Sequence, residues 1–257
     1  MVNWPRLQVC LIINPHFYTN PNGILFFLGS TVLKVSIIIP TLNEALILQE
    51  TLGKISRLHP HEIIIADGGS LDATVPIAKR ETTCVVECEP GRALQMNAGA
   101  REATGDLLLF IHADSRVTPE SYHRMIEAMR SSDLVGGAFS LAIESEKISL
   151  KLISKLATLR SRHLNLVYGD QSIFVRTDVF RKLGGYSPLP ICEDLEFFRR
   201  LSRRGPVILL KEKAYTSARR WMSEGIPFTT FRNITIATLF LLGFSPRILS
   251  RWYQVIR

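Results

Sequence analysis

Short apolar runs alternate with helical patterns along most of the chain beyond residue 34. Four runs rich in Val, Ile or Leu, each followed by a turn signal, predict strands at 35–39, 62–66, 84–87 and 107–111. Between them, apolar residues recur at the spacing of an amphipathic helix, as at Leu48, Leu52 and Ile55 and again at Ala93, Met96, Asn97 and Ala100.

The second half of this region continues the alternation. It predicts further strands at 138–143, 171–175 and 207–210, with helices near 149–161 and 193–204. Such an order predicts an α/β fold with a central, mostly parallel sheet and helices on both faces. Binding sites in these sheets lie at the carboxyl ends of the strands. The residues that follow each strand are therefore the candidates for chemistry.

The first 34 residues form an extension of a different kind. No charged residue lies between Arg6 and Lys34, but Asn, Pro and Gly residues interrupt the stretch. It fits neither a membrane span, which needs about 20 mostly apolar residues, nor a signal peptide with a basic start and one apolar block. We expect a core domain at 35–221, and the hypothesis for the extension is that the natural start lies near Val32.

The last segment, 222–257, is apolar and basic. Residues 234–244 carry no charge, and eleven residues are too few to cross a bilayer. A short apolar helix with aromatic and basic flanks is typical of a membrane surface. The alternative is a helix that docks on the protein core. The flanking residues are Trp221, Arg232, Arg247, Arg251, Trp252 and Tyr253.

Charge distribution adds to this picture. The chain of 257 residues has a net charge of +8, but residues 197–257 hold 12 Lys and Arg against only Glu212 and Glu224. That excess indicates an anionic partner, such as a membrane surface, a lipid phosphate or nucleic acid, or else a solvated basic face. A hydrophobic fraction of 46% excludes a disordered chain, and four scattered cysteines indicate reduced thiols in a cytoplasmic protein.

Two predicted strands end in polar residues that suit a nucleotide. The first ends in Pro40-Thr41-Leu42-Asn43-Glu44, which either lines a ligand crevice or forms a capping box of Thr41 and Glu44. The second ends in Asp67-Gly68-Gly69-Ser70-Leu71-Asp72. There Asp67 can accept hydrogen bonds from a base or a ribose, and the glycines allow close backbone approach. The alternative is that Ser70 or Asp72 caps the next helix.

Two further blocks suit a diphosphate and its counter-ion. Arg92 opens a helix, where a cation is unfavourable unless it meets a phosphate; the alternative is an exposed side chain. His112 and Asp114 follow a wholly apolar strand. A carboxylate there suits Mg²⁺ or Mn²⁺, and an imidazole favours Mn²⁺, whereas the alternative for His112 is a core histidine.

The last block supplies acids at the start of a helix. Glu193 and Asp194 precede the apolar stripe of Phe197, Phe198 and Leu201. The helix dipole favours acids at this position, and a paired acid is also a candidate general base. Asp170, within Gly169-Asp170-Gln171, comes before another predicted strand. We expect it to line the same cavity.

Together these blocks resemble family 2 glycosyltransferases of the GT-A fold, in particular small stand-alone bacterial members. The resemblance runs from about Val35 to Trp221 through VSIIIPTLNE, ADGGSLDAT, GRALQMNAGA, HAD, ED and ARRW. It implies a nucleotide-diphosphate sugar donor, Asp194 as catalytic base, and a divalent metal, Mn²⁺ or Mg²⁺, on Asp114 with His112, since HAD replaces the usual DxD. The implied substrate-binding residues are Pro40, Thr41, Glu44, Asp67, Gly69, Arg92, Gln95, Asn97, Asp170, Glu193, Arg219, Arg220 and Trp221.

The leading expectation is an inverting transfer of a sugar to a lipid-linked or apolar acceptor. The enzyme is expected in the cytoplasm, peripheral on the inner face of the cell membrane, with no nucleic-acid partner. Two alternatives stay open. One is a sugar-1-phosphate nucleotidyltransferase-like enzyme, although PTLNEA lacks a Gly-rich basic loop. The other is a non-enzymatic protein that binds an anionic polymer through the basic C-terminus.

Overall fold

The computed structural model describes residues 17–19, 25–27, 33–82, 84–131 and 133–253, within two units, 1–32 and 33–257. In the first unit, β1 (Phe17–Thr19) pairs antiparallel with β2 (Leu25–Phe27). Most of the predicted extension, including its expected natural start, lies outside the described residues. All that follows concerns the second unit.

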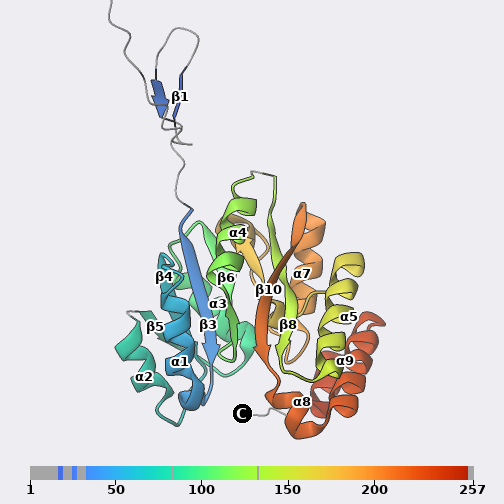
Figure 1. Cartoon of the computed structure of the whole chain (residues 1–257). Helices are drawn as coiled ribbons and strands as arrows, with labels where there is room; N and C mark the ends of the chain where they lie inside the picture. Colours follow the sequence, from blue (N-terminus) through green and yellow to red (C-terminus); the bar gives the residue numbers. More distant parts are fainter. Residues whose placement is uncertain (1–16, 20–24, 28–32, 83, 132, 254–257) are drawn as a thin grey trace, which may run out of the picture. The chain divides into compact units, whose positions relative to one another are not determined.

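An eight-stranded sheet forms the centre of this unit, in the order β5-β4-β3-β6-β9-β8-β10-β7 (Figure 1). β3, β4, β5 and β6 run parallel, as do β8 and β10, whereas β9 and β7 run antiparallel to their neighbours. The prediction of a mostly parallel sheet is therefore confirmed. The strands are β3 (Val35–Thr41), β4 (Glu62–Asp67), β5 (Cys84–Glu87), β6 (Leu107–Phe110), β7 (Ser115–Val117), β8 (Gly136–Glu144), β9 (Phe174–Arg176) and β10 (Val207–Ser217).

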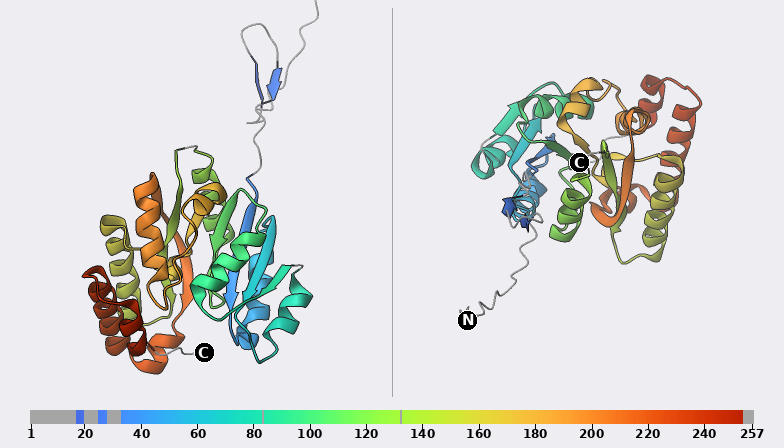
Figure 2. Two further views of the ribbon diagram at one scale, coloured as in Figure 1. Left: turned by 180° about the vertical axis from the view of Figure 1, so that it is seen from behind. Right: turned by 90° about the horizontal axis from the view of Figure 1, so that it is seen from above.

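Helices cover both faces of the sheet, as predicted (Figure 2). On one face, Leu48, Leu52 and Met125 pack on the strands, and on the other Met96 and Phe197 do so. Burial of these apolar side chains on both sides explains why the central strands are continuous apolar runs. The helices of the first face are α1 (Ala45–Ser56), α2 (Thr74–Glu81) and α4 (Pro119–Met129), and those of the second are α3 (Arg92–Glu102), α6 (Thr177–Lys182) and α7 (Glu193–Arg204).

Two predicted strands differ from the structure. The segment expected at 171–175 begins instead with a 3-10 turn, η1 (Gly169–Gln171), and the chain reverses at Ser172, whose φ of 48° lies in the left-handed region. The strand itself starts at Phe174, because the extended ladder resumes only after this turn. The strand expected at 207–210 continues to Ser217 through a register shift between Leu209 and Lys213.

The C-terminal part follows β10 as α8 (Arg219–Glu224), α9 (Ile226–Leu241), α10 (Pro246–Leu249) and the 3-10 turn η2 (Ser250–Trp252). On its inner side, Ile236 and Leu249 pack against Ile191 and Leu195. The alternative of a helix docked on the core therefore describes this side. No helix among the described residues is both long and apolar enough to cross a membrane.

Candidate active site at the carboxyl edge of the sheet

The carboxyl ends of the strands bring distant polar blocks to one edge. β3 and β4 are in register to their last residues, with Thr41 opposite Asp67. The turn after β6 meets the end of β10, since the Ser217 N–H donates to the Asp114 carbonyl at 3.1 Å. η1 starts the antiparallel β9 and reaches the same edge. The predicted site residues thus share one edge, but they fall into separate networks.

Asp194 has a carboxylate held by two backbone amides. Oδ2 accepts from the Gly169 N–H at 2.6 Å, and Oδ1 accepts from the Leu195 N–H at 2.7 Å. The second donor belongs to the first turn of α7, where N–H groups have no helical partner. Gly169 also touches His112: a Cβ on Gly169 would lie 2.7 Å from the imidazole Nε2 and 3.3 Å from Asp194 Oδ2. Only a residue without a side chain fits between these two groups.

Asp170 stands beside the same groups. Its Oδ1 is buried and accepts no hydrogen bond from the protein. Burial, opposed by the charge of Arg160 and assisted by the charges of Asp194 and Asp114, raises the pKa of the carboxyl to about 7. The negative charges of these acids therefore act on one another. We call His112, Asp114, Asp170 and Asp194 the carboxylate cluster.

The surroundings of His112 favour its neutral form. Burial lowers the pKa of its imidazole, and the nearby Arg92 lowers it further, against the opposing effect of Asp114 and Asp194. A neutral imidazole keeps one nitrogen as an acceptor, which suits a metal ion or a hydroxyl group. The ring lies next to Gly169, and the charges of Asp114 and Asp194 act on it, so the ligand role of His112 stays a prediction.

Arg92 forms an ion pair with Glu193. Its Nε lies 2.8 Å from Oε1 of Glu193, whose side chain is only 2% exposed. Burial raises the pKa of Glu193, and Arg92 opposes this shift. The other oxygen, Oε2, is buried without a partner. The Arg92 side chain as a whole is 38% exposed, so contact of this residue with a phosphate stays a prediction.

Asp67 is fully buried and organises two loops. Its Oδ2 accepts from the hydroxyls of Thr41 and Ser70, and its Oδ1 accepts from the Gly69 and Ser70 N–H groups. The capping-box alternative for Thr41 is wrong, because α1 follows Glu44 with no side-chain cap. The next helix is also uncapped at Ala73, although Asp72 accepts from the Thr74 N–H at 3.0 Å. Pro40 is buried at the end of β3.

The side-chain amides of Gln95 and Asn97 form hydrogen bonds with backbone groups of other segments. The Gln95 amide donates to the Thr41 carbonyl at 2.6 Å and to the Ala66 carbonyl at 3.0 Å. The Asn97 amide donates to the Tyr186 carbonyl and accepts from the Tyr186 N–H, both at 2.8 Å. With their amides engaged in this way, the ligand roles expected for both residues stay predictions.

The arginines of α8 border the carboxyl edge of the sheet. Arg219 Nη2 lies 3.5 Å from Oε2 of Glu44, which joins α8 to the turn after β3. The Arg220 guanidinium stacks over the Tyr253 ring at 4.4 Å, and its charge reaches His112. Trp221 instead packs with Leu141 and other apolar residues in the protein core. The two arginines thus border the site, and Trp221 anchors them.

Arg160 was not predicted from the sequence. It stacks on the Tyr168 ring at 3.8 Å and donates to the Leu166 carbonyl, and its buried Nη2 has no partner. Its positive charge lowers the pKa of Asp170 more than the charge of Arg92 does. It lies on α5 (Ile148–Leu164) amid Lys and Arg residues of similar appearance, so no local signal distinguishes it.

A divalent metal ion in a protein needs several oxygen or nitrogen ligands that converge on one point. Within the described residues, no three His, Cys, Asp or Glu side chains converge to hold one. Asp114 accepts only a 3.3 Å bond from the Ser115 hydroxyl, so its carboxylate has oxygens to spare. Three of the four residues in the carboxylate cluster are acids, so a cation would also offset their negative charge. A divalent cation shared between Asp114, His112 and a diphosphate fits these residues, whereas one held by the protein alone does not.

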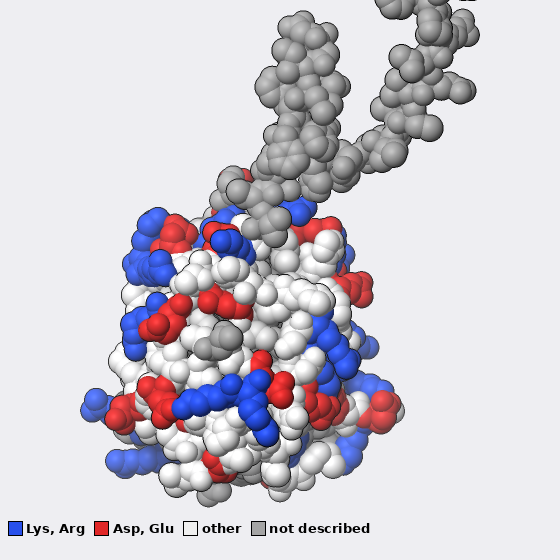
Figure 3. Space-filling view, turned by 90° about the vertical axis from the view of Figure 1, so that its left-hand side faces the viewer, with Lys and Arg blue, Asp and Glu red and all other residues white. Residues whose placement is uncertain are grey.

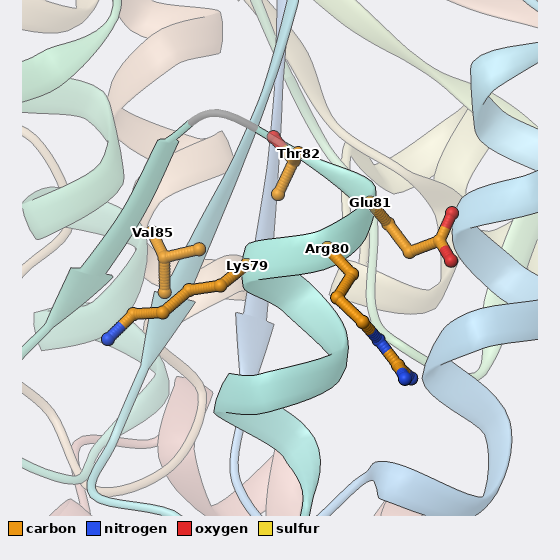
Figure 4. Close-up of a pocket in the computed structure, with 5 residues that line it drawn as sticks. All are labelled: Lys79, Arg80, Glu81, Thr82 and Val85. Carbon is orange, nitrogen blue, oxygen red and sulfur yellow. The ribbon is translucent and has the colours of Figure 1, made fainter.

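A depression of about 460 Å³ lies elsewhere, at the end of α2 and the start of β5 (Figure 4). Lys79, Arg80, Glu81, Thr82 and Val85 line it. Because β5 begins here, this is the amino edge of the sheet, opposite the predicted residues. None of the polar blocks contributes to it.

Residues 36–182 match the model of "Glycosyl transferase family 2", which is more than half of the chain. Glycosyltransferase AglE of Haloferax volcanii is 25% identical over 173 residues, which are 61% of this chain and 57% of that protein. The dolichol-phosphate mannosyltransferase of Pyrococcus furiosus is 31% identical over 143 residues, 51% of this chain and 41% of that protein. The chain spans 35% to 61% of three curated relatives.

Among solved structures, mannosyltransferase PcManGT of Pyrobaculum calidifontis, in complex with GDP-Man and Mn²⁺, superposes with a TM-score of 0.56. The likeness covers 72% of this chain and 57% of that chain at 18% identity, so it establishes the fold. The family match also decides against the nucleotidyltransferase-like and non-enzymatic alternatives. The chain belongs to glycosyl transferase family 2 and has the GT-A fold.

Proposed function

We propose that the chain transfers a sugar, with inversion, from a nucleotide-diphosphate sugar to a lipid-linked or otherwise apolar acceptor. The observation that carries the proposal is the fixed carboxylate of Asp194 beside His112 and Asp170. A single positioned base next to a site for a diphosphate suits a one-step displacement at the anomeric carbon. A single displacement inverts the configuration of that carbon.

In this step an acceptor oxygen attacks the anomeric carbon, and the bond from that carbon to the diphosphate breaks. The electron pair of the broken bond leaves with the nucleoside diphosphate. Asp194 accepts the proton of an acceptor hydroxyl, or orients the acceptor where it is already an anion such as a lipid phosphate. The two backbone N–H groups keep the carboxylate in one orientation, which favours proton transfer.

The leaving diphosphate needs positive charge in an acid-rich site. Arg92, Arg219 and Arg220 border the edge and are candidates to meet phosphate oxygens. A divalent metal on Asp114 and His112, when bound, neutralises the charge that develops on the diphosphate. The relative solved with GDP-Man and Mn²⁺ supports this combination. Thr41, Asp67 and their loops would hold the nucleoside side of the cleft.

The proposed acceptor follows from the C-terminal helices and from the relatives. The outer side of α9 and α10 exposes apolar residues, among them Phe231, Leu242 and Ile248. A relative named dolichol-phosphate mannosyltransferase points to polyprenyl-phosphate acceptors. We therefore propose a peripheral enzyme on the inner, cytoplasmic face of the cell membrane.

The test is a transfer assay with the full chain, a panel of nucleotide sugars, Mn²⁺ and a polyprenyl phosphate. We expect release of nucleoside diphosphate together with a glycosylated lipid of inverted anomeric configuration, read by NMR. Asp194→Asn keeps the shape of the side chain but can accept only one of the two backbone hydrogen bonds, because its NH2 group donates. It should lower transfer by at least about 1000-fold, and thermal unfolding checks that the variant is folded. Transfer by this variant at the wild-type rate, or a retained configuration, would refute the mechanism.

A further inference from the structure

The outer face of α5 carries an apolar stripe. Ile148, Leu152, Leu156 and Leu159 follow one another at spacings of four, four and three residues, so they lie on one side of the helix. They are 83%, 54%, 55% and 54% exposed, while Leu150, Ser154 and Ser161 on the opposite side are buried. We call these four residues the α5 stripe.

Polar contacts fix the helix with this stripe outward. The Ser154 hydroxyl accepts from the Ile143 N–H at 3.0 Å, and Thr158 accepts from the Leu141 N–H at 3.1 Å. These hydroxyls satisfy backbone groups of β8. Rotation of α5 to bury the leucines would leave both N–H groups unpaired, which is costly in a protein interior. The exposure of the leucines is therefore built into the fold.

The stripe borders a second apolar surface. α5 and α9 lie side by side in both views of the molecule (Figures 1 and 2). Ile153 and Ala157 of α5 pack in one cluster with Trp221 of α8 and Ile226 of α9, so apolar side chains join these helices beneath the surface. Monomeric proteins rarely expose an apolar surface of this extent without a partner. The exposed apolar residues of the second surface are Phe228, Phe231, Ile234, Leu242, Phe244, Ile248 and Trp252.

Charge around these surfaces is mostly basic. Lys155 and Arg162 are exposed alongside the stripe, as is Lys151, which pairs with the exposed Glu146, and residues 225–253 contain no Asp or Glu. The face that α1 and α2 cover differs, since acidic and basic side chains are interspersed there (Figure 3). Apolar residues flanked by Lys and Arg match a bilayer with anionic headgroups, because the side chains enter the acyl boundary and the cations stay at the headgroups.

We propose that the α5 stripe, continuous with the outer sides of α9 and α10, docks on an anionic lipid bilayer. This deepens the proposed function, on whose membrane acceptor it rests, by adding a helix from inside the catalytic unit to the contact. The far end of α5 is tied to the site: the Ser161 hydroxyl donates to Gln171 Oε1 at 2.6 Å, within the turn η1 that carries Gly169 and Asp170. Docking through α5 would thus hold the carboxylate cluster at a fixed height above the membrane.

The test measures binding of the full chain to phosphatidylcholine vesicles with and without phosphatidylglycerol, by cosedimentation. The combined variant Leu152→Gln, Leu156→Gln and Leu159→Gln should bind anionic vesicles at least about tenfold more weakly, since each leucine loses its apolar burial. A matched control changes two leucines of the other half of the fold, Leu46→Gln and Leu71→Gln, which are 98% and 95% exposed. It should bind like the wild type.

Three results would overturn the proposal: equal binding by the α5 variant, equal loss in the control, or no vesicle binding by the wild type. A wild-type dimer in sedimentation equilibrium that the α5 variant abolishes, without vesicle binding, would assign the stripe to a second copy. Thermal unfolding of each variant in solution shows that it is folded. No nucleotide sugar is present, so a negative result leaves the transfer chemistry untouched, and a failed transfer assay leaves vesicle binding untouched.

Discussion

Arg92 and Glu193, about a hundred residues apart, meet at 2.8 Å where the N-terminus of α3 faces that of α7. Glu193 is almost fully buried, whereas Arg92 is more than a third exposed. The acid thus depends on one cation that also faces the proposed diphosphate. We therefore expect donor binding and fold stability to be coupled through this pair.

Arg92→Ala should lower the free energy of unfolding by about 1–3 kcal/mol at neutral pH, because a buried carboxylate loses its partner. Burial already raises the pKa of Glu193 above its unfolded value. The folded state therefore binds the proton more tightly, and stability falls as pH rises above the unfolded pKa. Thermal unfolding between about pH 5 and 8 should show a steeper fall in the variant. Addition of Glu193→Gln should restore stability; no rescue would contradict the account.

Asp170 should make the wild type less stable as the solution becomes more alkaline. Its folded pKa of about 7 lies above the usual aspartate value of 3.8, so between about pH 4 and 7 the folded state keeps a proton that the unfolded state has lost, and stability falls over that range. Asp170→Asn should remove this dependence and raise Tm by several degrees above pH 7. Asp178→Asn, which breaks an exposed pair with Lys182, is the control and should leave the dependence unchanged. An identical pH profile in Asp170→Asn would contradict the prediction.

Gly169→Ala should displace a neighbouring side chain of the site, because there is little room for the added methyl group. The new Cβ would lie 2.7 Å from the His112 imidazole and 3.3 Å from Asp194 Oδ2, so one of them must move. We expect transfer to fall about 10- to 100-fold, the scale of a misplaced catalytic group. Gly53→Ala in α1 meets nothing within 4 Å and should leave transfer unchanged while stabilising the helix by about 0.5–1 kcal/mol. Steady-state kinetics with thermal unfolding separates the two effects.

Asn97→Ala should act on stability more than on donor binding. Both ends of its amide bond the Tyr186 backbone, and their loss should cost about 1–3 kcal/mol. Gln49→Ala, at an exposed position of α1, serves as the control and should be nearly neutral. Calorimetry and nucleotide-sugar titration check this. A large loss of affinity with unchanged stability would show instead that Asn97 contacts the donor.

Transfer should stop in EDTA and return with Mn²⁺ or Mg²⁺. Asp114→Asn should raise the Mn²⁺ concentration needed by at least about tenfold, because one charged ligand is lost. Mn²⁺ binding followed by electron paramagnetic resonance, with and without nucleoside diphosphate, gives a readout independent of turnover. Strong Mn²⁺ binding without the nucleotide would contradict a site completed by phosphates.

The strands and the order of the polar blocks could be predicted from the sequence. A parallel strand buried on both faces is a continuous apolar run, as at Leu107–Phe110, and the residues after it must lie at the carboxyl edge. Local signals were less reliable where a side chain had competing partners. Thr41 resembled a helix cap, yet its hydroxyl bonds Asp67, which lies on the neighbouring strand. Such a contact depends on strand register, which no local pattern contains.

The sequence by itself determined the α/β order, the basic C-terminal quarter and the acids that follow the strands, because burial and turn chemistry act over a few neighbouring residues. Only the tertiary structure decided that Gly169 separates His112 from Asp194, and that α5 buries serines and exposes leucines. A helical period shows that two faces differ but not which one is inside. In α5 the inner face is set by two N–H groups of β8, which donate hydrogen bonds to the hydroxyls of Ser154 and Thr158.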